Sequence, residues 1–515
     1  MKYLPSKITI GLLILSSLAF SNEEPSYAVV DTGQSNFYDN KYYSTKPKTN
    51  EKFYGQDASY DGYQPSYENN FDGSVSDKNT KLIWQKKFSE KLTWSEAVNY
   101  ANNSKLAGYN DWRIPTIKEL YSLIDFSGVT GTSRNKGTQV PNNAKPYINT
   151  KYFDFEYSSD KRYIDAQYWT QTDYTSTTMN GAKTFFGVNF ADGRIKGYPK
   201  YNKGQRGSTK FYLRLVRGNS QYGKNDFVDK KNGVILDNAT KLSWMKKDSG
   251  DKIFNSMQNT GALNWEKALS FCERLDYAGI DSWRLPNAKE LHTIVDYTKS
   301  PDSTNSASIN ELFNTTSIKN AKGQKDYPFY WTSTTHLDGH QMGNSAVYFA
   351  FGRAMGYMKD RRTNSKMLLD VHGAGAQRSD PKSGDASKFK YGRGPQGDVI
   401  SINNYVRCVS DSMTSISKNS SSNSTKPNYN NHERKFDNQN SAQSQNSNEF
   451  QKIPKNDKNN LGHAHRVLQR FDRNSDEKIS YEEAPRRMKE NFKRHDENDD
   501  GYLDIKELDT LPVPR

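Results

Sequence analysis

Two acidic segments near the carboxyl end place oxygen-bearing side chains at the spacing of a metal site. They span residues 472–483 and 496–507, and each is twelve residues long and ends in glutamate. Ca²⁺ takes about six to eight oxygen ligands, and loops of this length supply them from positions one, three, five, seven, nine and twelve. Those positions hold Asp472, Asn474, Asp476, Lys478, Ser480 and Glu483 in the first segment, and Asp496, Asn498, Asp500, Tyr502, Asp504 and Glu507 in the second. Position seven offers only its main-chain carbonyl, so both segments are predicted to bind Ca²⁺.

This spacing resembles that of a pair of EF-hands. The second loop has Gly501 at position six, where the chain turns sharply, whereas the first has Glu477 there. A side chain makes that turn costly, so we expect weaker binding in the first loop. Ile479 and Leu503, at position eight, are predicted to join the loops through a β-bridge. The resemblance implies a small all-α unit at 461–515 with Ca²⁺ as cofactor; the alternative is an acidic, solvated helix pair whose spacing arises by chance.

A larger motif occurs twice earlier in the chain. The string AGYNDWRIPTIKEL at 107–120 recurs as AGIDSWRLPNAKEL at 278–291. Other pairs recur in the same order: Thr80–Trp84 and Thr240–Trp244, Trp94 and Trp265, Tyr168–Thr170 and Tyr330–Thr332, and Gly193–Arg194 and Gly352–Arg353. The chain therefore contains an internal duplication, with a first copy at 71–218 and a second copy at 226–410.

Each copy mixes helical and strand patterns. In the first copy, Trp94, Ala97 and Ala101 fall on one face of a predicted helix. Pro115 is predicted in the first turn of a second helix, 116–124, because its fixed φ suits that position. Strings such as VNFADGR predict strands joined by turns. Each copy is therefore predicted to be an α+β unit with short strands and long loops.

The repeated strings resemble the DUF1566 domain, also known as the C-terminal domain of the Legionella collagen-like adhesin (Lcl). That family has a C-type-lectin-like fold, occurs on exported bacterial proteins and is associated with binding of sulfated polysaccharide. The resemblance implies two lectin-like modules in tandem, joined to the EF-hand pair by disordered linkers. Trp112 and Trp283 are expected to fill the two cores. Arg113 and Arg284 are expected to bind nearby carbonyls or carboxylates rather than sugar.

The only two cysteines, Cys272 and Cys408, both lie in the second copy. The repeat aligns them with Ala101 and Leu215 of the first copy, which are both apolar. Two distant positions that change together are expected to touch. In an exported protein this predicts a disulfide between Cys272 and Cys408. Two buried free thiols are the alternative.

The ends of the two copies differ in composition from their interiors. A basic start and the apolar run 8–20 make residues 1–21 a predicted signal peptide, because the run is too short to span a bilayer; an N-terminal anchor is the alternative. No later segment has the length of a membrane span. The protein is therefore expected in the periplasm, on the cell surface or in the medium. The Tyr/Asn-rich residues 22–70 are predicted to be a flexible leader, and the Ser/Asn-rich residues 411–460 a disordered linker.

The net charge of +14 raises the question of polyanionic partners. Basic residues are dispersed among 59 acidic ones without a nucleic-acid motif, so no nucleic-acid partner is expected. A solvated basic surface is one interpretation, and contact with an anionic polysaccharide or a cell-surface glycan is the other. No catalytic motif such as GxSxG or HExxH is present, so we hypothesise an adhesion protein rather than an enzyme. The alternatives are an exported enzyme on a formylglycine-generating-enzyme-like scaffold and a scaffold for envelope assembly with an envelope protein as its partner.

Overall fold

The computed structural model describes two compact units, which lie within residues 1–418 and 419–515. The described residues are 25–131, 137–201, 209–255, 261–339, 341–360 and 363–411, and in the second unit 478–481, 484, 486–489, 492–496, 500–504 and 507–508. The predicted signal peptide lies outside these residues, as does the predicted linker apart from Asp411. Within them, no helix has both the length and the apolar character needed to cross a membrane.

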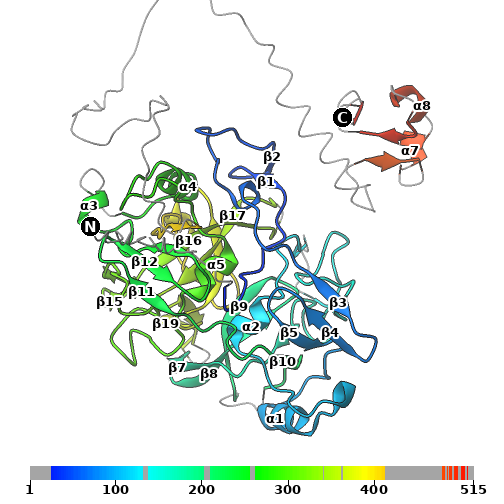
Figure 1. The fold of residues 1–515 in the computed structure, drawn as a ribbon, viewed down its shortest axis with the longest axis horizontal. Coiled ribbons are helices and arrows are strands. Elements are labelled where there is room, and N and C mark those ends of the chain that lie inside the picture. The colour runs from blue at the N-terminus through cyan, green and yellow to red at the C-terminus, as the bar shows by residue number, and fades with distance from the viewer. Residues whose placement is uncertain are drawn as a thin grey trace, which may run out of the picture. The chain divides into compact units, whose positions relative to one another are not determined.

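Each copy is closed by a small four-stranded antiparallel sheet (Figure 1). At the first copy its strands are, in spatial order, β10 (Val216–Gly218), β5 (Leu82–Gln85), β4 (Ser74–Asp77) and β3 (Tyr67–Asn69), of which β3 comes from the segment 25–70 that precedes the copy. In the second copy they are β21 (Val409–Ser410), β13 (Ser243–Met245), β12 (Val234–Asp237) and β11 (Phe227–Asp229). The last strand of each copy thus returns to its start. The equivalent residues Trp84 and Trp244 are fully buried beneath these sheets.

Two helices recur in each copy. They are α1 (Trp94–Asn103) and α2 (Ile117–Tyr121) in the first copy, and α4 (Trp265–Glu273) and α5 (Ala288–Thr293) in the second. The helix predicted from Trp94 is confirmed, but the one predicted at 116–124 is shorter. Thr116 is its N-cap: the hydroxyl of Thr116 accepts the N–H of Glu119, whose carboxylate accepts the N–H of Thr116. This capping box fixes the start, so Pro115 lies before the helix and not in its first turn.

The two copies are β-rich domains in tandem along the chain, and they share a seven-stranded sheet. Its order is β16-β17-β20-β9-β8-β6, with β7 also paired to β8. The second copy supplies β16 (Phe329–His336), β17 (Ser345–Ala350) and β20 (Gln377–Pro381), and the first supplies β6 (Gln167–Tyr168), β7 (Asp173–Thr178), β8 (Ala182–Asn189) and β9 (Arg194–Pro199). The sheets of the copies join where Gln377 pairs with Ile195. The side-chain oxygen of Gln377 also accepts the N–H of Ile195 at 3.1 Å.

The second copy contains an insertion that the first copy lacks. The first copy runs from Tyr198 to Tyr212, whereas the second runs from Tyr357 to the equivalent Tyr405. The longer path holds most of the hairpin β18 (Met355–Lys359) and β19 (Lys366–Asp370), then β20 and the short helix η3 (Ala386–Phe389). The insertion therefore provides β20, the strand that joins the two copies. The remaining short elements of this unit are η1 (Asp57–Ser59), η2 (Leu106–Gly108), α3 (Lys252–Asn255), β14 (Ile318–Lys319) and β15 (Lys325–Asp326).

Residues 25–70 do not form a flexible leader, and that prediction is wrong for them. This segment, dark blue in Figure 1, contains β1 (Phe37–Tyr38) and β2 (Tyr43–Ser44) and passes between the copies. Its carbonyl at Thr32 accepts the N–H of Phe126 in the first copy at 2.7 Å. The Gln34 amide exchanges two 2.8 Å hydrogen bonds with the main chain of Thr335 in the second copy. Polar side chains paired with main-chain groups thus fix a segment that has few aliphatic residues.

The described part of the C-terminal unit contains two strands and two short helices. These are β22 (Ile479–Ser480), β23 (Tyr502–Leu503), α7 (Arg486–Lys489) and α8 (Phe492–His495). Ile479 pairs with Leu503 in an antiparallel bridge, which confirms the bridge predicted between the two acidic segments. Both residues are fully buried in a small apolar cluster with Phe492 and Leu508.

Candidate functional site

The repeated tryptophan and arginine of the WRxP strings have structural roles, as predicted. Trp112 and Trp283 are 4% and 1% exposed, and each indole N–H donates to a main-chain carbonyl within its own copy. Arg284 donates two hydrogen bonds of 2.6 Å to the carboxylate of Glu290, which completes the capping box of α5 with the N-cap Asn287. Arg113 and Glu119 form the same two-bond pair in the first copy. The motif thus ties a core tryptophan to the start of a helix, and its arginine is paired with a carboxylate in both copies.

The lysine of each repeated KEL string reaches into the other copy, a role that the sequence analysis missed. Lys118 Nζ donates to the carbonyl oxygen of Thr293 at 2.7 Å, and Lys289 Nζ donates to that of Ser122 at 2.9 Å. Thr293 and Ser122 are equivalent positions of the repeat, so the contact is reciprocal, as in a two-fold symmetric dimer. Burial lowers the pKa of both lysines to about 8. These lysines hold the copies together.

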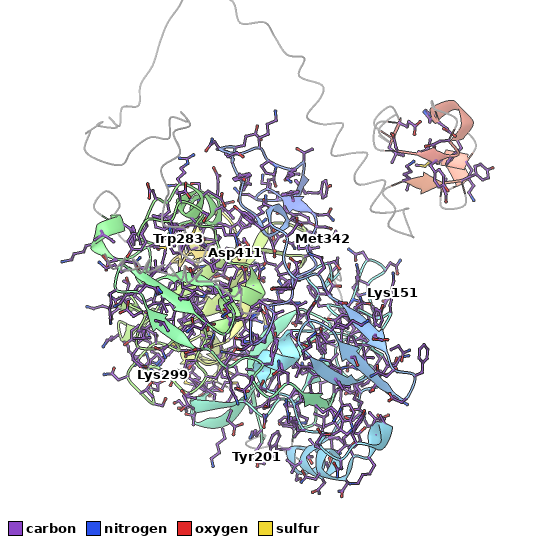
Figure 2. All side chains as sticks on the ribbon, viewed as in Figure 1. Lys151, Tyr201, Trp283, Lys299, Met342 and Asp411 are labelled. Carbon is purple, nitrogen blue, oxygen red and sulfur yellow. A yellow bond between two sulfur atoms is a disulfide. The ribbon has the colours of Figure 1, made fainter. Side chains whose placement is uncertain are left out.

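The predicted disulfide between Cys272 and Cys408 is present, with a sulfur–sulfur distance of 2.07 Å. Both residues are fully buried. In the first copy the equivalent Ala101 and Leu215 lie together in one apolar cluster. Figure 2 labels Trp283 and Asp411, which belong to the two segments that meet next to this bond through Arg284.

A group of exposed cations lies on the insertion of the second copy. We name it the basic hairpin surface, and its residues are Lys359, Lys366, Lys388, Lys390, Arg393 and Tyr391. Lys359 and Lys366 stand directly opposite each other across the β18–β19 ladder. Like charges in this arrangement destabilise a hairpin. The same arrangement occurs in the β14–β15 hairpin, where Lys319 faces Lys325, so the opposed pair alone does not mark a binding site.

An exposed aromatic ring lies among these cations. Tyr391 is 45% exposed, and the Nζ atoms of Lys366 and Lys390 lie 4.1 and 5.5 Å from the centre of its ring. The ring also packs edge-on against Tyr357 of β18 at 5.7 Å, which holds the segment 388–393 against the hairpin. Cations around an aromatic face could hold the sulfate groups of a sugar beside its ring. This surface was not predicted from the sequence, although the strings KDRRTNSK and KFKYGR carry its signal.

Only part of the predicted calcium loops can be described. Asp472, Asn474, Asp476, Glu483 and Asn498 lie outside the described residues. Ser480 of the first loop pairs with Tyr502 of the second loop in the bridge between them, and Lys478 directly precedes the bridge. Lys478 Nζ lies 3.0 Å from Oδ2 of Asp500, so a cation of the first loop contacts a predicted calcium ligand of the second.

The described carboxylates of the second loop hold its main chain in a tight turn. Asp496 accepts the N–H groups of Asp500 and Gly501 at 3.0 and 2.9 Å, and Gly501 has a φ of +82°, which favours glycine. Asp504 and Glu507 accept each other's N–H at 3.1 and 2.8 Å. These oxygens are of the type that Ca²⁺ prefers. Among the described residues, however, no three acidic, histidine or cysteine side chains come close enough together to hold a metal ion.

Comparison with known families identifies the duplicated segment. The family model of the Lcl C-terminal domain matches residues 73–217 and 233–371, which together exceed half of the chain. The chain belongs to this family. Neither a curated protein nor a solved structure matches the chain. The second Lcl C-terminal domain match ends at Val371, before β20 and before the segment 388–393. Four of the six residues of the basic hairpin surface thus lie beyond the part of this chain that the family model matches.

Proposed function

We propose that the protein is an exported adhesion protein whose paired Lcl C-terminal domains bind an anionic polysaccharide, and whose C-terminal EF-hand pair binds Ca²⁺. The match to the Lcl C-terminal domain in two copies carries the proposal, because this family is associated with surface and adhesin-like proteins. A lectin-like fold of each domain and residence outside the cytoplasm belong to the same proposal.

The basic hairpin surface supports the choice of an anionic ligand. Lys359 and Lys366 face each other on the hairpin, and Lys366 and Lys390 lie against the ring of the exposed Tyr391. Lys388 and Arg393 are exposed in the same short segment as Tyr391. Clustered cations raise the local concentration of a polyanion and bind it in a salt-dependent way. A dispersed basic charge would give weaker retention that depends on the net charge alone.

The test compares two triple variants of the full chain on an immobilised sulfated polysaccharide. The first, Lys359→Gln with Lys366→Gln and Lys390→Gln, removes three charges from the basic hairpin surface. The control, Lys319→Gln with Lys322→Gln and Lys325→Gln, removes three exposed charges from the β14–β15 hairpin, where Lys319 also faces Lys325. We expect the first variant to elute at much lower salt than the control. Equal elution of both variants would show that net charge alone governs retention and would contradict a site on this surface.

The calcium part of the proposal has its own support and its own test. It rests on the twelve-residue spacing, the bridge between Ile479 and Leu503, and the turn at Gly501. Asp496, Asp504 and Glu507 would supply carboxylate oxygens to the ion, and metal binding would stabilise a unit with so small a core. Calorimetric titration of the full chain with CaCl₂ tests it, and an absence of binding heat at millimolar Ca²⁺ would contradict it.

A further inference from the structure

A cavity of about 540 Å³ lies between the two copies. Its walls come from α2 of the first copy, the segment 220–227 that connects the copies, and the chain that follows α5. Its volume is within the roughly 300–1,000 Å³ of ordinary ligand pockets. Aromatic rings of Tyr222, Phe227 and Tyr297 and amide groups of Gln171, Asn225 and Asn310 line it. The cavity belongs neither to the basic hairpin surface nor to the calcium loops.

The repeat relates this cavity to an equivalent place on the other side of the molecule. Thr172 of the cavity corresponds to Thr334, and the hydroxyl of each accepts the N–H of the first residue of a helix, at 3.0 Å from Ile117 and 2.9 Å from Ala288. Tyr297 of the cavity corresponds in the same way to Phe126. The two places therefore present the same main-chain and hydroxyl groups.

The equivalent place is filled by the N-terminal segment of this chain. The carbonyl of Thr32 accepts the N–H of Phe126 at 2.7 Å. The hydroxyl of Thr334 donates to the carboxylate of Asp57, which also accepts the hydroxyl of Thr32 at 2.8 Å. Thr32 and Asp57 are 0% and 4% exposed. Two parts of the N-terminal segment thus fill that side: the extended chain at Thr32, and the carboxylate of Asp57 from η1, 25 residues later.

In the cavity, the matching donors have no such partner. Among the described residues, none accepts a hydrogen bond from the N–H of Tyr297 or from the hydroxyl of Thr172. The segment 220–227 that connects the copies matches the N-terminal segment at one position only. Lys118 Nζ donates to the carbonyl of Gly223 at 3.1 Å, just as the equivalent Lys289 Nζ donates to the carbonyl of Asp31 at 2.8 Å.

Beyond that point the connecting segment leaves the path. Asn225 and the N–H of Asp226 bond instead to the carboxylate of Asp237, at 2.8 and 2.9 Å. The chain therefore turns away where the N-terminal segment would continue as Thr32 to Gln34, and the cavity marks the space left behind.

We propose that this cavity binds an extended, acidic polypeptide segment of a partner protein. A main-chain carbonyl of the partner accepts the N–H of Tyr297, and a carboxylate accepts the hydroxyl of Thr172. The exposed Lys224 at the wall favours an acidic segment, whereas Arg113 is already paired with Glu119. The segment in the equivalent place shows which chemistry these groups accept, and it is a polypeptide rather than a sugar.

The test uses the full chain and a fluorescein-labelled peptide with the sequence of residues 29–35, VVDTGQS. We expect saturable binding by fluorescence anisotropy. Gln171→Trp, which places a large ring at the cavity wall, should abolish it. Gln221→Trp, an exposed position outside the lining, should leave it unchanged and serves as the matched control.

Further variants and competitors separate this proposal from its rivals. Lys224→Glu should weaken peptide binding about two- to five-fold, as expected for an exposed charge pair, whereas Lys230→Glu, also exposed, should not. An absence of saturable binding, or equal binding to the Gln171→Trp and Gln221→Trp variants, would overturn the proposal. Displacement of the peptide by a sulfated oligosaccharide whose own binding is also lost in Gln171→Trp would assign the cavity to sugar and overturn it as well.

Discussion

Removal of the disulfide tests the duplication and the fold together. The double variant Cys272→Ala with Cys408→Leu gives the second copy the residue pair that the first copy has at the equivalent positions. The bond links residues 136 apart in the sequence, and a loop of this length constrains the unfolded chain by about 5 kcal/mol at 25 °C in the entropy model. Because both positions are fully buried, fitting a leucine adds a further cost of about 1–3 kcal/mol.

Urea unfolding followed by tryptophan fluorescence measures this loss. We expect the midpoint of the variant to fall well below that of the oxidised protein, and the reduced wild-type protein to fall by a similar amount. A thiol assay in urea without reductant should detect no free thiol in the wild type. An unchanged midpoint in the variant, or two titratable thiols in the unreduced protein, would refute the reasoning.

Three further predictions follow from the repeat, from burial and from the second acidic loop. Ala101→Cys with Leu215→Cys should form a second disulfide under oxidising conditions, detected by mass spectrometry; two free thiols would show that the copies do not superpose there. Burial raises the pKa of Asp57 to about 7, so the folded state binds a proton that the unfolded state releases, and this group's contribution to stability is lost as the pH rises from about 4 to 7. Asp57→Asn should therefore flatten the dependence of the free energy of unfolding on pH over this range, by up to about 1.4 kcal/mol per pH unit. Urea unfolding at a series of pH values measures it, and an unchanged slope would contradict the assignment. Glu507→Gln should weaken Ca²⁺ binding in calorimetry at least ten-fold, more than Glu483→Gln in the first loop; the reverse order would contradict the stronger second site.

Local and repeated features of the fold were predictable from the sequence. The tryptophans of the repeated WRxP strings, the apolar face with Ala97 and Ala101, and the paired change to cysteine each report a contact within one copy. Such contacts recur because the copy recurs. The buried Trp112 and Trp283 and the bond between Cys272 and Cys408 accordingly agree with the predictions.

Contacts between distant segments were not predictable in this way. Gln34 bonds to Thr335 across 301 residues, and nothing in the polar composition around Gln34 indicates its partner. Lys118 and Lys289 have the same sequence context as surface lysines, and only the packing of the two copies buries them. The strand β20 belongs to an insertion without a counterpart in the first copy, so the repeat carried no information about it.

The helix predicted at 116–124 is shorter than expected for a different reason. The pattern over 116–124 continues the apolar spacing beyond the point where the helix ends at Tyr121. The hydroxyl of Ser122 donates to the carbonyl of Glu119 at 2.7 Å. The following residues Leu123 and Ile124 are buried without being helical, so apolar periodicity alone could not mark the boundary.

Calorimetric titration of the full chain with a sulfated heparin oligosaccharide, beside its desulfated form, tests the central claim most directly. The account predicts saturable binding of the sulfated form at physiological salt, weakening as salt rises, with little binding of the desulfated form. An absence of binding heat for the sulfated form at low salt, or equal binding of both forms, would contradict it.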